Sequence, residues 1–178
     1  MIEGQLISAA ALNRRVTALG QAISAHYRGE RVTVVALLDG TIVFLADLIR
    51  AIDHPLQLDL VKVSSYGSGT VSGDLTVSRA PSTDLKDRHV LIVDDILDTG
   101  RTLQAVQALV LQSRPRSLRT CVLLDKPARR TVKIKPDHVG FVIPDAFVVG
   151  YGMDYAGHFR QLPFIGIPKM VNGKPIEP

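Results

Sequence analysis

The chain has 178 residues, which is enough for one domain with a substantial core and too few for two large ones. Apolar residues make up 46% and charged residues 21%, as in an ordinary soluble globular protein. The formal net charge of +4 and the pI of about 9.4 permit nucleic-acid binding without favouring it, because the basic residues are scattered and aromatic residues are few. A small anionic substrate explains this charge equally well.

Location is addressed by three features of the sequence. Apolar runs such as residues 41–49 are interrupted or too short to span a bilayer. The first ten residues, MIEGQLISAA, include an acid and no basic region, so they do not resemble a signal peptide. Cys121 is the single cysteine, and its apolar run CVLL favours a small buried hydrophobe over a reactive thiol. We therefore expect a cytoplasmic protein with no membrane partner.

Apolar periodicity divides the chain into helices and strands. In chain order we expect a helix at 8–28, a strand at 31–38, a helix at 41–53, strands at 56–66 and 89–95, a helix at 101–113, and strands at 117–126 and 138–144. This alternation predicts a single α/β domain over 1–178, with a mostly parallel twisted sheet flanked by helices.

Two segments fall outside the alternation. Residues 67–87 are rich in Gly, Ser and Thr and are long for a connection inside a compact domain. They predict a functional flap, at about 64–87, or an excursion with a short hairpin of its own. The tail at 147–168 consists of short apolar pieces separated by Gly and Pro.

The stretch VLIVDDILDTGRTLQAV, at 90–106, runs from a predicted strand through a turn into a predicted helix. Free N–H groups and the positive end of the helix dipole attract an anion at such a turn. Gly100 lets the backbone approach a ligand, and Thr99 and Thr102 add hydroxyl donors. Residues 98–102 therefore predict a phosphate cradle, although neither the Walker A pattern nor GxGxxG is present.

Asp94 and Asp95 precede this cradle and would repel an anion unless they bind something else. Vicinal sugar hydroxyls are one candidate, since a carboxylate accepts several hydrogen bonds. A divalent cation is another, since Mg²⁺ prefers a few carboxylates together with substrate oxygens. Asp98 lies apart at the mouth of the loop, where it could exchange a proton with a bound group. An ordinary capped turn explains a lone Asp-Thr-Gly, but not the whole pattern.

With these residues in view, VLIVDDILDTGRTL resembles the phosphoribosyl pyrophosphate signature of type I phosphoribosyltransferases. Other segments resemble the hypoxanthine-guanine branch in the same order: LLDGTIVFLADLIR, SSYGSGTVSGD, LLDKPARR and PDHVGFVIPDAFVVGYGMDYAGHFRQLPFIGIP. The resemblance implies the type I fold, with a flexible flap and a small hood from the terminal segments. It implies purine salvage: a 6-oxopurine base and phosphoribosyl pyrophosphate give IMP or GMP and pyrophosphate, with Mg²⁺ as cofactor.

The resemblance also implies residue roles. Asp94 and Asp95 would hold the ribose hydroxyls and help to place Mg²⁺, and Asp98 would be the acid/base at purine N7. The 5′-phosphate would lie against Asp98 and the four residues that follow it, Thr99, Gly100, Arg101 and Thr102.

Further roles fall on the second half of the chain, with a base-binding segment at about 136–168. Lys126 would donate to the purine 6-oxo group, and Phe147 would stack on the base with Val148 alongside. Asp154 would ligate Mg²⁺ near the pyrophosphate, which Arg160 would bind. The flap would contribute two residues, Ser65 and Tyr66.

One position departs from the family pattern. The turn at Asp39 and Gly40 would bind pyrophosphate through backbone N–H groups, often across a cis peptide, but a lysine is usual where this chain has Asp39. The acid puts any side-chain contribution there in doubt. A milder change is Asp94-Asp95 where many members have Glu-Asp.

Several alternatives stay open on the sequence. A phosphoribosyltransferase fold that acts as a nucleic-acid-binding regulator is one, though the intact site residues and the lack of an added DNA-binding segment make nucleic acid an unlikely partner. A xanthine- or pyrimidine-specific transferase is another. The resemblance suggests a homodimer or homotetramer, and the preference among hypoxanthine, guanine and xanthine stays undetermined.

Overall fold

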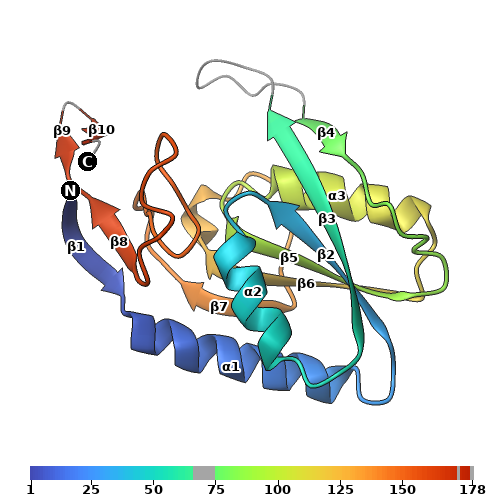
Figure 1. The fold of residues 1–178 in the computed structure, drawn as a ribbon. Coiled ribbons are helices and arrows are strands. Elements are labelled where there is room, and N and C mark those ends of the chain that lie inside the picture. The colour runs from blue at the N-terminus through green and yellow to red at the C-terminus, as the bar shows by residue number, and fades with distance from the viewer. Residues whose placement is uncertain (66–74, 172, 177–178) are drawn as a thin grey trace.

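The computed structural model describes residues 1–65, 75–171 and 173–176, and Figure 1 shows the arrangement of the chain. In chain order the elements are β1 (Ile2–Ile7), α1 (Ala9–His26), β2 (Val32–Leu38), α2 (Ile42–Ala51), β3 (Leu56–Ser65), β4 (Leu75–Arg79), β5 (His89–Leu97), α3 (Arg101–Gln112), β6 (Ser117–Asp125), a 3-10 turn (Pro127–Arg129), β7 (His138–Val142), β8 (Ile165–Pro168), β9 (Met170–Val171) and β10 (Lys174–Pro175).

The main sheet has six strands in the order β4-β3-β2-β5-β6-β7. All neighbours pair in parallel except β4, which runs antiparallel to β3 at one edge. The predicted α/β class, with a mostly parallel sheet flanked by helices, is confirmed. In such a sheet the carboxyl ends of β2, β5 and β6 lie at the same end of the sheet, and ligands bind beside these strand ends.

Both faces of the sheet are covered because side chains alternate along each strand. Leu91 and Val93 of β5 belong to the core beneath α1 and α2, whereas Val90 and Ile92 belong to the core beneath α3. Figure 1 shows α1 and α2 on one face and α3 on the other. Cys121 is fully buried in the first core, as predicted, and burial raises the pKa of its thiol to about 12.

The first helix begins where the sequence predicts. The Ser8 hydroxyl accepts a hydrogen bond from the N–H of Ala11 at 3.2 Å, which satisfies one of the free donors at the start of α1. The helix buries its apolar stripe against α2 and the sheet, with Leu12, Val16 and Ile23 almost fully enclosed. No described helix is long and apolar enough to cross a membrane.

The two ends of the chain meet in a small second sheet. β1 and β8 pair antiparallel, with Ile7 opposite Ile165, and Figure 1 shows them beside the loops of the C-terminal segment. This pair corresponds to the expected hood from the terminal segments. The strand at Ile2–Ile7 is not predicted by the sequence analysis, which assigns no element before residue 8.

Part of the predicted flap lies within the main sheet. β4 pairs with β3 from Ser65 opposite Leu75 to Lys62 opposite Arg79, and Leu85 is buried in the core beneath α3. Residues 66–74, with Tyr66 among them, lie outside the described residues. Ser65 is described as the last residue of β3, at the point where the chain enters that segment.

Candidate active site

The predicted phosphate cradle forms a small cavity between the end of β5 and the start of α3. Its volume is about 250 Å³, and its lining consists of Asp94, Asp95, Ile96, Leu97, Asp98, Thr99, Gly100, Thr102 and Leu103. Gly100, at the start of α3, has no side chain to cap the helix, and Thr99 Oγ1 accepts from the N–H of Arg101, at 3.4 Å. Other N–H groups of the first turn therefore stay available to a bound anion. Arg101 differs from its neighbours, since it is exposed and outside this lining.

The turn of the cradle depends on Gly100. This residue has φ 88°, a left-handed conformation that costs little only for glycine. A Cβ there would also come within 2.7 Å of Ile134 Cγ2 and 2.9 Å of Val132 Cγ2. The N–H of Thr131 donates to the carbonyl of Thr99 at 3.0 Å. The segment at 130–134, to which the sequence analysis assigns no role, therefore supports the cradle from behind.

The two carboxyl groups before the cradle are enclosed by protein. Asp94 is 8% exposed, and burial raises the pKa of its carboxyl well above the ordinary value, with the adjacent Asp95 adding to the effect. Burial also raises the pKa of Asp95, against hydrogen bonds that favour its ionised form. Asp94 accepts from the N–H of Asp95 at 3.0 Å, and Asp95 from the N–H of Ile96 at 2.9 Å. Such groups stay poised to bind hydroxyls or a cation.

A second cavity of about 410 Å³ adjoins the first and shares Asp95, Ile96 and Asp98 with it. Loops that are distant in sequence meet here, and the lining consists of Leu38, Asp39, Gly40, Lys62, Val63, Asp95, Ile96, Asp98, Lys126, Phe147, Val148, Met153, Asp154 and Arg160. The structure therefore brings together the predicted base and pyrophosphate residues next to the predicted cradle.

Three loops are in close contact at this second cavity. A Cβ on Gly40 would lie 1.9 Å from Asp95 Oδ2, and one on Gly152 would lie 2.2 Å from the carbonyl oxygen of Gly40. Gly152 also has φ 101°, so it meets both a steric and a conformational demand. The peptide between Leu38 and Asp39 is cis, as the family resemblance suggests for this turn. Gly152 is not among the site residues predicted from the sequence.

The side of the cavity expected to hold the base combines a cation with an aromatic ring. Lys126 follows β6 and is 6% exposed. Its backbone N–H donates a hydrogen bond to the carbonyl of Leu97 at 3.0 Å. Phe147 is 45% exposed, and its ring meets that of Tyr155 edge to face at 5.8 Å. Val148 is buried beside it. An exposed aromatic face next to a buried ammonium suits a planar, polar ring.

Asp98 does not stand alone, because Arg129 reaches it from the 3-10 turn after β6. The Arg129 Nε lies 3.1 Å from Asp98 Oδ1 and 3.8 Å from Asp145 Oδ1. Arg130 donates to the Asp98 carbonyl at 3.1 Å and pairs with Asp125. Neither arginine is among the residues predicted from the sequence. The arginine pair comes two residues after LLDK, beyond Pro127 and Ala128, so its position just past a predicted strand end was the available signal.

Asp154 and Arg160 form the far wall. Arg160 Nη2 lies 2.8 Å from Asp154 Oδ1, and the N–H of Gly157 donates to the other carboxylate oxygen at 2.8 Å. Both oxygens of Asp154 therefore have partners, while Asp94 accepts the N–H of Asp95 and Asp95 accepts the N–H of Ile96. This donor set fits Mg²⁺, which binds through one or two carboxylates with substrate oxygens. Among the described residues, no three His, Cys, Asp or Glu side chains lie close enough together to hold a metal ion by themselves.

Asp39, the acid at the turn where the family usually has a lysine, has an ion-pair partner that was not predicted from the sequence. Lys62 Nζ lies 2.8 Å from Asp39 Oδ2, and both side chains are about half exposed at the wall of the second cavity. The parallel register of β2 and β3 places Leu38 opposite Lys62, which explains why the residue after Leu38 is within reach.

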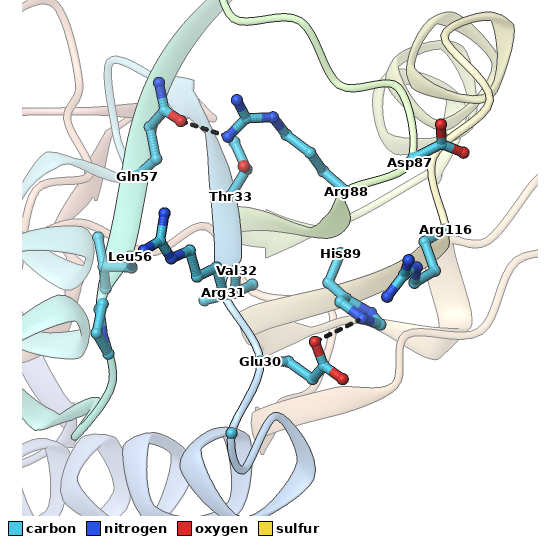
Figure 2. Close-up of a pocket in the computed structure, with 12 residues that line it drawn as sticks. Glu30, Arg31, Val32, Thr33, Leu56, Gln57, Asp87, Arg88, His89 and Arg116 are labelled. Atoms are coloured by element: carbon cyan, nitrogen blue, oxygen red, sulfur yellow. Dashed lines mark hydrogen bonds and ion pairs between the residues drawn. The ribbon is translucent and has the colours of Figure 1, made fainter.

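A larger cavity, of about 610 Å³, lies at the amino ends of β2, β3 and β5 (Figure 2). Charged side chains of both signs line it, namely Glu30, Arg31, Asp87, Arg88 and Arg116. Arg88 donates to Gln57 at 2.6 Å, and Glu30 lies 3.7 Å from His89, as the dashed lines show. The predicted site residues that the structure describes all lie elsewhere, so size alone does not mark the reaction centre.

Comparison with known proteins is consistent with this geometry. The profile of the phosphoribosyl transferase domain matches residues 4–156. The hypoxanthine phosphoribosyltransferase of Haemophilus influenzae is 44% identical over 165 residues, which cover 90% of this chain and 92% of that protein. The chain belongs to the phosphoribosyl transferase family, in its hypoxanthine phosphoribosyltransferase branch.

This phosphoribosyltransferase also matches solved structures of the branch. The crystal structure of a hypoxanthine-guanine phosphoribosyltransferase from Bacillus anthracis superposes with a TM-score of 0.88 at 38% identity, covering 94% of this chain and 98% of that one. A bifunctional TilS/HprT protein of Listeria innocua is 44% identical over 169 residues, or 94% of this chain. The chain therefore matches only 26% of the length of that bifunctional relative.

Proposed function

We propose that this protein is a purine-salvage enzyme that transfers the phosphoribosyl group from phosphoribosyl pyrophosphate to hypoxanthine, and to guanine, giving IMP or GMP and pyrophosphate. The observation that carries the proposal is the junction of the two cavities at Asp95, Ile96 and Asp98. A sugar phosphate in the cradle would present its reacting carbon to a base held between Lys126 and Phe147.

The reaction breaks the bond from ribose C1 to a pyrophosphate oxygen and forms a bond from C1 to purine N9. Positive charge builds on the sugar and negative charge on the leaving group. Asp95 would face the sugar, and Arg160 would stabilise the leaving group. Asp98 would accept the proton from N7 as N9 attacks C1 of the ribose.

Three of the predicted site residues are acids that support Mg²⁺ as the cofactor. Asp94, Asp95 and Asp154 would hold Mg²⁺, which when bound neutralises charge on the pyrophosphate oxygens. We also infer a cytoplasmic location, which agrees with the single buried Cys121, and a homodimer or homotetramer in solution.

A product assay tests the function directly. Pyrophosphate release is followed with phosphoribosyl pyrophosphate, Mg²⁺ and each of four bases: hypoxanthine, guanine, xanthine and adenine. We expect turnover with hypoxanthine and guanine, and only weak turnover with adenine. The proposal is wrong if none of the bases is converted, and the 6-oxopurine assignment is wrong if adenine is the best substrate.

Lys126 is expected to choose between 6-oxo and 6-amino purines. Its ammonium can donate to an oxo acceptor but not to an amino donor, so a mismatched base leaves it unpaired. Lys126→Met should lower kcat/KM for hypoxanthine roughly 10- to 150-fold, the usual worth of one charged hydrogen bond. The ratio of hypoxanthine to adenine turnover should fall with it. Lys126→Arg serves as the charge-retaining control, and an unchanged ratio in Lys126→Met would remove Lys126 from base selection.

A further inference from the structure

The ion pair between Lys62 and Asp39 places a lysine from β3 beside the turn expected to receive pyrophosphate. The two groups are 2.8 Å apart, and their side chains are 49% and 53% exposed. Both line the second cavity together with Arg160. The pair therefore faces the space that a diphosphate would enter, although neither residue belongs to the phosphate cradle.

The charges around this cavity show why the pair matters. Its lining carries four carboxylates, Asp39, Asp95, Asp98 and Asp154. Two of them have arginine partners, since Asp98 pairs with Arg129 and Asp154 with Arg160. Lys62 is the cation that meets Asp39. Without that cation the turn would present an uncompensated negative charge to an anionic ligand, and like charges at close range repel.

The packing of the turn makes this repulsion hard to avoid. Gly40 lies against Asp95, and the carbonyl oxygen of Gly40 lies against Gly152, so the backbone next to Asp39 cannot move away without disturbing both neighbours. A pyrophosphate that approached the backbone N–H groups of this turn would pass close to the Asp39 carboxylate. Neutralising the carboxylate is then simpler than displacing it.

We propose that Lys62 is a positioning residue that neutralises Asp39 and thereby lets the turn at 38–41 accept the pyrophosphate group of the substrate. The proposal rests on the proposed transferase function. It is distinct from direct binding, in which the Lys62 ammonium would itself contact a phosphate oxygen. The two roles differ in one respect: neutralisation loses its purpose when Asp39 carries no charge.

A double-mutant cycle on these two residues tests the proposal. Lys62→Met should raise KM for phosphoribosyl pyrophosphate about 5- to 30-fold, as expected for one uncompensated charge near a polyanion. KM for hypoxanthine and kcat should change less than about two-fold in this variant, because a shift confined to one substrate marks a loss of binding for that substrate. Asp39→Asn alone should lower KM for phosphoribosyl pyrophosphate, and the double variant should return close to the wild-type value.

Controls separate this role from a structural one. Lys62→Arg should restore the wild-type KM, and Lys86→Met, which removes the same charge at the amino end of β5, should leave KM unaltered. Unchanged KM in Lys62→Met overturns the proposal. A double variant as impaired as Lys62→Met overturns it too, in favour of direct binding. Calorimetric binding of Mg²⁺-pyrophosphate gives the same comparison without turnover, so inactivity with every base would count against the transferase function and not against the ion pair.

Discussion

Asp98→Asn is expected to lower kcat by about 10²–10⁴-fold, the usual contribution of one catalytic proton transfer. The two side chains have the same shape, and the carbonyl oxygen of the new amide could still accept the hydrogen bond that Arg129 donates at 3.1 Å in the wild type. An amide cannot take or return the N7 proton. KM for phosphoribosyl pyrophosphate should stay nearly unchanged, because the cradle N–H groups are untouched.

Steady-state kinetics with hypoxanthine, supported by a single-turnover measurement of the chemical step, would check this result. Asp145→Asn is the matched control, since it removes the other carboxylate near Arg129, at 3.8 Å, from outside the lining of both cavities. It should change kcat by less than a few-fold. Near-normal turnover in Asp98→Asn would reject the acid/base role, and a large rise in KM would mean that Asp98 acts mainly in binding.

Much of the fold could be predicted because its signals are local. The run at 31–38 is β-branched and continuous, and it is buried on both faces, as parallel strands usually are. The strand at Ile2–Ile7 was missed for the opposite reason. It is short, it carries two β-bulge irregularities, and it exists through pairing with β8, at the other end of the chain.

The site divides in the same way. The sequence could place four residues together, because the carboxyl ends of parallel strands lie at the same end of the sheet: Asp94, Asp95, Asp98 and Lys126. The ion pair of Lys62 and Asp39 could not, because it depends on the register of β2 against β3. A shift of one residue in that register would turn Lys62 to the other face. The contact of Gly152 with Gly40 needs the path of a loop that no periodicity describes.

Asp94→Asn should affect stability and activity in opposite directions. Burial and the neighbouring Asp95 raise the pKa of Asp94 in the folded state, so ionising it costs more there than in the unfolded chain. Removing the charge should raise the free energy of unfolding of the ligand-free protein at neutral pH by about 0.5–2 kcal/mol, the usual gain from a single stabilising substitution. Loss of the charged hydrogen bonds that we propose between Asp94 and the ribose should lower kcat/KM roughly 10- to 150-fold.

The pH dependence follows from linkage. A carboxyl whose folded pKa lies above its unfolded value of 3.8 holds more protons in the folded state, so stability is lost as pH rises through the raised pKa. The advantage of Asp94→Asn over wild type in urea denaturation should therefore grow as the pH rises above the unfolded pKa of 3.8.

Asp59 provides the contrasting control, since it is a buried aspartate whose pKa shifts the other way. Burial alone would raise its pKa, but hydrogen bonds donated by Thr83 and Ser82 at 2.7 Å outweigh that effect and lower it. Its contribution to stability is present above the unfolded pKa and is lost as pH falls, so Asp59→Asn should destabilise the protein at neutral pH. If Asp94→Asn also destabilised the ligand-free protein, the Asp94 carboxylate would be stabilising the fold. The idea that its burial lowers stability for the sake of substrate binding would then be wrong.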